Sequence, residues 1–280
     1  PRYCLAAPEI GGAQAVAEAW RNLIATGAKP LAITNNMNFG NPERPEIMGQ
    51  FVGCIKGMRE ACLKLDFPVV SGNVSLYNET DGKAIMPTPV IGGIGLLENA
   101  SNHITIDLKG ADETIVSIGM LTGWLGQSLY LRELFGQETG APPPINLDQE
   151  KLNGDFILRM IEGKYVTACH DISDGGLLVA ITEMAFSAIV KGKKLGVEII
   201  NTAELDPFAF YFGEEQARYI VTTVNPKKLL EMAQKAGVVA NIIGKTTSNG
   251  QLILPDNCSV ALEELYIAHD KWLPEYMLGA

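Results

Sequence analysis

Apolar residues recur at helical spacing in two stretches near the N-terminus, residues 13–26 and 47–65. In the first stretch, Val16, Trp20 and Ile24 are four residues apart, which places them on one side of an amphipathic helix. A glycine and a proline follow closely, as they do at helix C-termini. A short apolar run comes after each stretch, so this part of the chain predicts two helix–strand pairs.

The rest of the chain alternates in the same way. Further strands are predicted at residues 89–97, 113–121, 166–169, 198–200, 217–224, 241–247 and 251–255, the last two as a closing pair. Further helices are predicted within 123–136, at 151–162, after Gly176 and at 226–236. Glycines inside the strand at 89–97 indicate a bulge or a close backbone approach, and three consecutive prolines within 137–145 predict a loop. The alternation predicts an α/β or α+β fold, divided near Lys109 into segments 1–108 and 109–280.

Composition narrows the class of protein. The chain has 280 residues, 47% of them hydrophobic and 19% charged, which fits a globular protein with a sizeable core. The net charge is −10 and no basic stripe is present, so we expect no nucleic-acid partner. An acidic protein can still bind phosphates through backbone N–H groups and metal ions.

No apolar run approaches the roughly 20 residues of a membrane span, and no signal-peptide pattern opens the chain. The five cysteines are an odd number without a CxxC pair. They predict free thiols in a reducing cytosol rather than a zinc site or a disulfide framework. The start at Pro1 instead of Met predicts a segment of something longer.

Four asparagines and a glycine crowd residues 34–42, "TNNMNFGNP". We predict a loop here, because asparagine favours turns and tolerates left-handed backbone. Four carboxamides exceed what a turn requires, and they also suit a polyphosphate–metal complex.

The stretch "VVSGNVS", residues 69–75, raises the same two alternatives. Gly72 permits close backbone approach, Asn73 can give a carbonyl oxygen to Mg²⁺, and Ser71 and Ser75 offer hydroxyls. Local physics allows either a turn or an oxygen-rich cradle, and the phosphate-binding pattern G-x-x-x-x-G-K-[ST] is absent from the sequence.

Three further groups carry candidate chemistry. Glu18 and Asn22 are four residues apart on one predicted helix face, where they form either a solvated surface or an oxygen site for a hard cation. "HDISDGG", residues 170–176, precedes a helix whose N-terminus favours anions; Asp174 can be its N-cap, and His170 an acid/base or a structural group. "FGEEQAR", residues 212–218, is either functional or a charged strand entry neutralised by Arg218.

Four long motifs carry a family resemblance: "NFGNPERPEIMGQF", "VVSGNVSLYNET", "HDISDGGL" and "FGEEQARYIV". In this order they closely resemble the synthetase subunit of bacterial phosphoribosylformylglycinamidine synthase. The resemblance covers essentially the whole chain and matches the C-terminal part of that subunit, which in full is more than twice as long.

The resemblance implies a unit like aminoimidazole ribonucleotide synthetase. A ferredoxin-like domain, residues 1–108 and truncated at its start, would precede an α/β domain, residues 109–280. The family uses ATP, Mg²⁺ and glutamine-derived ammonia to convert formylglycinamide ribonucleotide to the amidine in purine biosynthesis, in the cytoplasm. The implied partners are a glutaminase subunit and a small bridging subunit, with a homodimer of the chain as a further option. In the family's full chain, domains of the first type pack into a central β-barrel.

The resemblance also implies site residues. Gly72, Asn73 and Ser75 match positions that contact nucleotide, magnesium and substrate, respectively. Asn35 stands where the family has an aspartate that contacts ATP. Four other residues match an auxiliary nucleotide site: Glu18, Asn22 and Asp171 would hold the metal, and Ser173 would contact the nucleotide.

Two departures and two alternatives accompany this interpretation. Asn35 removes a charge, and residues 4–12, "CLAAPEIGG", replace acidic residues of the relatives. The family's catalytic histidine belongs to its N-terminal half, so no catalytic residue is expected here and the chain alone should be inactive. One alternative is a complete enzyme of the same superfamily, such as a small-molecule kinase, but the sequence lacks the Asp-Gly-rich N-terminal metal segment that it would need. The other alternative is a non-catalytic dimerisation or scaffold module.

Overall fold

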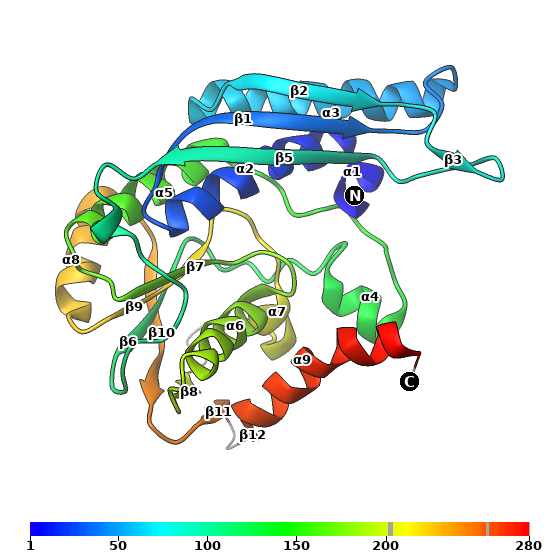
Figure 1. Cartoon of the computed structure of the whole chain (residues 1–280). Coiled ribbons are helices and arrows are strands. Elements are labelled where there is room, and N and C mark those ends of the chain that lie inside the picture. The colour runs from blue at the N-terminus through cyan, green and yellow to red at the C-terminus, as the bar shows by residue number, and fades with distance from the viewer. Residues whose placement is uncertain (201–203, 256–257, 280) are drawn as a thin grey trace.

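The computed structural model describes residues 1–200, 204–255 and 258–279. Two sheets organise these residues (Figure 1). The smaller has three strands in the order β2-β1-β5, with β2 parallel and β5 antiparallel to β1. Its strands are β1 (Lys29–Asn38), β2 (Val69–Ser75) and β5 (Thr88–Leu96), and its helices are α1 (Arg2–Ala6), α2 (Pro8–Ala25) and α3 (Pro45–Leu65). A two-stranded hairpin, β3 (Glu79–Thr80) with β4 (Lys83–Ala84), extends beyond its end.

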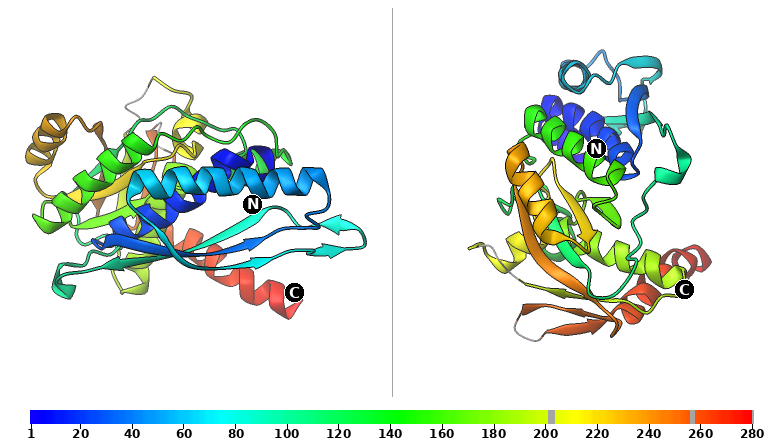
Figure 2. Two further views of the ribbon diagram at one scale, coloured as in Figure 1. Left: turned by 90° about the horizontal axis from the view of Figure 1, so that it is seen from above. Right: turned by 90° about the vertical axis from the view of Figure 1, so that its left-hand side faces the viewer.

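Glycines set how closely α2 and α3 pack. A Cβ atom built on Gly57 would lie 1.8 Å from the carbonyl oxygen of Glu9, and one built on Gly12 would lie 2.4 Å from that of Cys54. Neither position can accommodate a side chain unless the helices separate. The two helix backbones therefore touch, and α3 runs alongside the three long strands in the view from above (Figure 2).

The two faces of β5 differ. On the face toward α2, a Cβ on Gly93 or Gly95 would lie 3.1 Å from Leu23, which is the close backbone approach that the glycines predicted. On the other face, Val90, Ile94 and Leu96 are about half exposed, at 51%, 53% and 50%. We call this uncovered side of the three-stranded sheet the open face.

The larger sheet has seven strands in the order β12-β11-β8-β10-β6-β9-β7. Its strands are β6 (Thr114–Ile118), β7 (Ala168–Asp171), β8 (Gly196–Ile199), β9 (Tyr219–Thr223), β10 (Ala240–Thr247), β11 (Gln251–Ile253) and β12 (Ser259–Ala261). Its helices are α4 (Leu129–Phe135), α5 (Leu147–Glu162), α6 (Gly176–Val190), α7 (Pro207–Phe212), α8 (Pro226–Ala236) and α9 (Leu262–Leu278), with a short 3₁₀ turn at Ala100–Asn102 before the sheet.

Both faces of this sheet are covered. In β6, Ile115 packs into the core cluster that contains α6, while its neighbour Val116 packs into the cluster that contains α5 and α8. Two covered faces explain why β9 is buried along its whole length and β6 along all but its first residue. The mixture of helices and sheets confirms the predicted α/β class; the division at Lys109 stays a prediction.

Two element predictions were wrong, and three helices were missed. The asparagine-rich segment is a loop only in residues 39–42, because β1 continues to Asn38 between two pairing strands. The strands at 241–247 and 251–255 are not a pair, because β8 lies between β10 and β11. Helices α1, α7 and α9 were not predicted: two have six residues or fewer, and α9 contains Pro274 and largely exposed apolar residues.

No helix within the described ranges is long and apolar enough to cross a membrane.

Asp107 anchors the segment between the two sheets. Its carboxylate is 2% exposed and lies 2.6 Å from the ammonium groups of Lys109 and Lys191 and 3.6 Å from that of Lys193. Burial alone would raise the pKa of Asp107, but hydrogen bonds from Lys109, Lys191 and Thr105 hold it well below its usual range. The cluster ties the linking segment to the end of α6.

Replacing this carboxylate should destabilise the protein. We expect Asp107→Asn to lower the free energy of unfolding by about 2 kcal/mol, less than for a fully buried pair because its lysines are partly exposed. Since the folded-state pKa is depressed, the deficit should persist from about pH 8 to pH 5 and shrink as the pH falls below about 4. Urea unfolding of the parent and the variant at several pH values measures this difference in stability.

Glu198→Gln, which breaks the exposed pair with Lys245, is the control and should change the free energy of unfolding by less than about 0.5 kcal/mol. Equal losses in the two variants would contradict the prediction.

Candidate functional site

A cavity of about 150 Å³ lies where α2 meets the loop between β7 and α6. It brings together Glu18 from α2 and Ser173 from that loop, two predicted site residues that are far apart in sequence. The remaining lining residues are Pro1, Tyr3, Cys4, Gly11, Gln14, Ala15, Arg21, Pro89, Asp174 and Gln216. Elements of both sheets therefore form its walls.

Arg21 forms the buried side of the cavity. Its guanidinium lies 2.9 Å from a carboxylate oxygen of Glu150, 3.1 Å from Gln216 Oε1 and 3.9 Å from Asp171 Oδ2. Burial alone would lower the pKa of Arg21, but the charges of Glu150 and Asp171 raise it above its usual range. Arg21 therefore stays cationic and holds two carboxylates that belong to different elements, α5 and β7.

Glu18 gives the cavity an acidic character. Its side chain remains exposed at the mouth. The surrounding protein raises its pKa by desolvation, Asp174 and Asp171 raise it further, and Arg21 opposes them. With one guanidinium facing several carboxylates, the cavity favours a cation over a free anion.

The donor atoms suit a hard cation. Asp171 Oδ2 is buried and has no hydrogen-bond partner, and Asn22 lies exposed one turn beyond Glu18 on α2. Carboxylate and carboxamide oxygens are ligands that Mg²⁺ accepts. Within residues 1–200, 204–255 and 258–279, no three His, Cys, Asp or Glu side chains are close enough to hold a metal by themselves. The residues therefore fit a magnesium ion that also receives oxygens from water or phosphate.

His170 and Asp174, which lie close to Ser173, each contact charged side chains. His170 is bracketed by two carboxylates: Nδ1 lies 3.1 Å from Asp171 and Nε2 lies 3.1 Å from Glu183. Burial alone would lower the pKa of His170, but these hydrogen bonds raise it to about 9. Asp174 is not the N-cap of α6, since Gly175 holds that position and Asp174 accepts from Arg2 at 2.7 Å.

The glutamates of "FGEEQAR" fix the loops around the cavity. Glu214, 1% exposed, accepts the backbone N–H groups of Gly175 and Leu129 at 2.8 Å and also binds Arg2 and Tyr3 of α1. Glu215 accepts from the backbone of residues 122–123 and pairs with Arg218 at 2.8 Å. The predicted neutralisation by Arg218 therefore applies to Glu215, while Glu214 is neutralised by Arg2.

Asn35 and Gly72 lie elsewhere. In the parallel pairing of β1 with β2 they are direct neighbours, and a Cβ on Gly72 would lie 2.1 Å from Asn35 Oδ1. Gly72 thus leaves room for a carboxamide of the same sheet. Asn35 borders a separate, mostly apolar cavity of about 340 Å³ beside α3, together with Ile55, Met58, Arg59, Cys62, Leu63, Pro68 and Val69.

Asn73 and Ser75 form a third location on the sheet. Asn73 donates to Asn36 Oδ1 at 3.1 Å, and the Ser75 hydroxyl contacts the Asn78 carboxamide at 3.1–3.3 Å. The stretch 69–75 is one continuous strand, so its polar residues do not form a turn. The predicted residues are therefore divided among three places, and only Glu18 and Ser173 line one cavity.

Models of the AIR synthase related protein family match most of the chain. The N-terminal domain model matches residues 1–97, and the C-terminal domain model matches residues 111–257. The chain belongs to this family. The predicted resemblance is thereby confirmed at the level of the family.

Similar members of the family carry one name. The chain is 53% identical over its whole length to the phosphoribosylformylglycinamidine synthase subunit PurL of Bradyrhizobium sp. (strain BTAi1) and 52% identical over 99% of its length to that of Azorhizobium caulinodans. It spans 38% and 37% of those relatives. The expected resemblance to this synthase is confirmed, and the match covers just over a third of the relatives' length.

Solved structures share the family fold. Thermotoga maritima PurL complexed with FGAR superposes with a TM-score of 0.74 at 20% identity, over 95% of this chain and 44% of that one. T. maritima PurL complexed with ATP gives a TM-score of 0.68 at 20% identity, over 92% and 41%. The PurLQS structure from the same organism gives 0.70 at 19%, over 93% and 42%.

Several site residues of this family member were not predicted from its sequence. Arg21 and Glu150 lie inside helices, where a charged residue usually faces solvent, and Arg2 lies in a helix of five residues. Only one signal was available: Arg21 shares a helix side with the apolar Ala17 and Ile24, so its charge required a buried partner.

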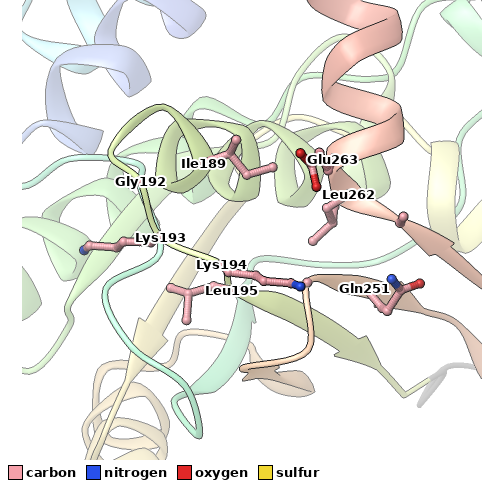
Figure 3. Close-up of a pocket in the computed structure, with 10 residues that line it drawn as sticks. Ile189, Gly192, Lys193, Lys194, Leu195, Gln251, Leu262 and Glu263 are labelled. Carbon is pink, nitrogen blue, oxygen red and sulfur yellow. The ribbon is translucent and has the colours of Figure 1, made fainter.

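A further cavity, of about 330 Å³, lies far from these residues in the fold. It is formed where the end of α6 meets β11 and the start of α9. Figure 3 shows Lys194, Gln251 and Glu263 around it, whereas Lys193 extends away. None of the predicted site residues borders this cavity.

Proposed function

We propose that this chain binds a magnesium–nucleotide complex in the cavity between α2 and the loop before α6. The observation that carries the proposal is the meeting of Glu18 and Ser173 in one acidic cavity. Glu18, Asn22 and Asp171 would hold the metal, and the Ser173 hydroxyl would contact the nucleotide. Mg²⁺ would neutralise phosphate charge, and Glu214 would keep the loop in place through Gly175.

At the level of the whole protein, we propose the C-terminal part of an ATP-dependent carbon–nitrogen ligase. It would convert formylglycinamide ribonucleotide to the amidine with glutamine-derived ammonia, together with a glutaminase subunit and a small bridging subunit. The support is the name shared by the similar relatives, and the solved structures of PurL complexed with ATP, of PurL complexed with FGAR and of PurLQS. The open-face residues Asn73 and Ser75, and Asn35 beside α3, remain proposed contacts for magnesium, substrate and nucleotide.

Calorimetric titration of Mg·ADP into the chain tests the cavity. We expect saturable binding that Glu18→Gln weakens about tenfold, because a carboxylate ligand of the metal is lost. Glu9→Gln, an exposed glutamate at the start of the same helix, is the control and should bind like the parent. Absence of binding at millimolar nucleotide, or equal weakening by the two substitutions, would refute the cavity site.

A non-catalytic dimerisation or scaffold module is the second candidate. The open face favours it, because Val90, Ile94 and Leu96 are half exposed and the outer edge of β2 pairs with no strand of the described residues. Apolar sheet surface of this kind requires a covering partner. Sedimentation velocity combined with the Mg·ADP titration separates the candidates: a stable dimer without nucleotide binding favours the scaffold.

A further inference from the structure

Two cysteine thiols from different helices meet beside the candidate cavity. Cys4 of α1 and Cys54 of α3 are 3% and 0% exposed, and their side chains are hydrogen-bonded to each other. They belong to sequence segments fifty residues apart. Cys4 also lies in the stretch "CLAAPEIGG", which the candidate function leaves without a role.

Consecutive glycines of α2 position the two cysteines. A Cβ on Gly11 would lie 2.7 Å from the Cα of Cys4, and a Cβ on Gly12 would lie 2.7 Å from the Cα of Cys54. Only hydrogen atoms at these glycines allow α1 and α3 to approach α2 so closely. The Gly-Gly pair thus seats both cysteine backbones against the same turn of α2.

The two thiols have different acidities. The hydrogen bond from Cys54 lowers the pKa of Cys4, although burial opposes it. The same hydrogen bond and burial raise the pKa of Cys54. Cys4 is therefore the more acidic thiol of the pair, which suits it to act as the nucleophile and Cys54 to act as the resolving cysteine.

A small oxidant has a route to this pair. Cys4 is among the residues that line the 150 Å³ cavity, whereas Cys54 lies behind it in the core. A peroxide-sized molecule fits such a cavity. A bulky disulfide reagent would have to displace α1.

We propose that Cys4 and Cys54 form a reversible oxidation site, at which hydrogen peroxide converts the two thiols to a disulfide that joins α1 to α3. The Cys4 thiolate attacks one peroxide oxygen, the O–O bond breaks, and the departing hydroxide takes up a proton to form water. Cys54 then attacks the resulting sulfenic sulfur, the S–O bond breaks, and a second water leaves. The sulfurs must approach to about 2 Å, and a thiol reductant restores both thiols.

The disulfide would act on the cavity wall. Through Arg2 and Tyr3, α1 holds Glu214, which in turn holds the loop at Gly175. Joining α1 to α3 would fix that connection. The oxidation site itself does not depend on nucleotide binding, so its test is independent of the proposed function.

Peptide mapping by mass spectrometry tests the site. The reduced chain is treated with hydrogen peroxide, its remaining thiols are blocked, and it is digested without reductant. We expect a cross-linked peptide pair that contains Cys4 and Cys54, two hydrogens lighter than its separate peptides, which a thiol reductant splits. In Cys54→Ala the cross-link should vanish, and Cys4, without a resolving thiol, should gain two oxygens as sulfinic acid.

Cys62→Ala is the matched control, because Cys62 lies two turns farther along α3 and is partly exposed; the cross-link should persist in it. The proposal is overturned if Cys4 stays reduced while the exposed Cys258 is oxidised, or if Cys4 cross-links equally to Cys62. If Cys54→Ala does not fold, as circular dichroism would reveal, the maps of the unaltered chain and of Cys62→Ala decide the question.

Discussion

Replacing Gly57 by alanine is expected to lower the free energy of unfolding by about 3 kcal/mol, because the added methyl would overlap backbone. A Cβ at this position would lie 1.8 Å from the carbonyl oxygen of Glu9, and this oxygen belongs to a helix that cannot rotate away as a side chain would. Helices α2 and α3 would have to separate. Urea unfolding monitored by circular dichroism measures the loss.

The same helix supplies a control for this prediction. Gly49 is exposed, and nothing lies within 4 Å of the position its Cβ would occupy. Gly49→Ala should therefore raise the free energy of unfolding by about 0.5–1 kcal/mol, through helix propensity alone. If Gly57→Ala lowers the free energy of unfolding and Gly49→Ala raises it, the close contact of α2 with α3 is established. Similar changes in the two variants would disprove it.

Removing the guanidinium of Arg21 is expected to cost about 3–5 kcal/mol of unfolding free energy. Arg21→Met would leave Glu150, which is 0% exposed, without its cation, and the buried Asp171 with His170 alone. Adding Glu150→Gln removes one of the uncompensated charges, so the double variant should recover at least about 1 kcal/mol. Arg132→Met, from the exposed pair with Glu133, should change stability by less than about 0.5 kcal/mol.

Acid should partly rescue the Arg21→Met variant. Burial raises the pKa of Glu150 even while Arg21 opposes it, so loss of Arg21 should raise that pKa further. A carboxyl group with a raised folded-state pKa binds its proton more tightly when folded, and stability then increases as the pH falls through that pKa. Unfolding at pH 8 and pH 5 should show a smaller deficit at the lower pH; a deficit that grows on acidification would contradict the assignment of Glu150.

Periodicity predicted the long helices that bury one side in a core, because their apolar residues lie on that side. It missed α9, whose apolar residues are largely exposed. Helix α8 matches residues 226–236 at both ends, since a proline begins it and a glycine ends it. The asparagine-rich part of β1 was predicted as a loop because local preference favours turns, but pairing with strands on both sides outweighs that preference. The insertion of β8 between β10 and β11 depends on contacts between distant segments, which periodicity does not report.

The candidate site was only partly predictable for the same reason. Family motifs pointed to Glu18 and Ser173, which share a cavity. The sequence indicated that Arg21 shares a helix side with apolar residues, but not that its partner is Glu150, because this pairing depends on how α2 packs against α5. Gly72 illustrates the converse: the motif suggested close approach of a ligand, and the group beside it is the Asn35 carboxamide of the neighbouring strand.

The contacts around the cavity also impose an order on folding. Arg2 reaches Glu214 across 212 positions of the chain, and Arg21 reaches Glu150 across 129. Such non-local contacts form late, because closing a long loop costs entropy that contacts formed earlier must first offset. The cavity is therefore expected to be among the last features to form.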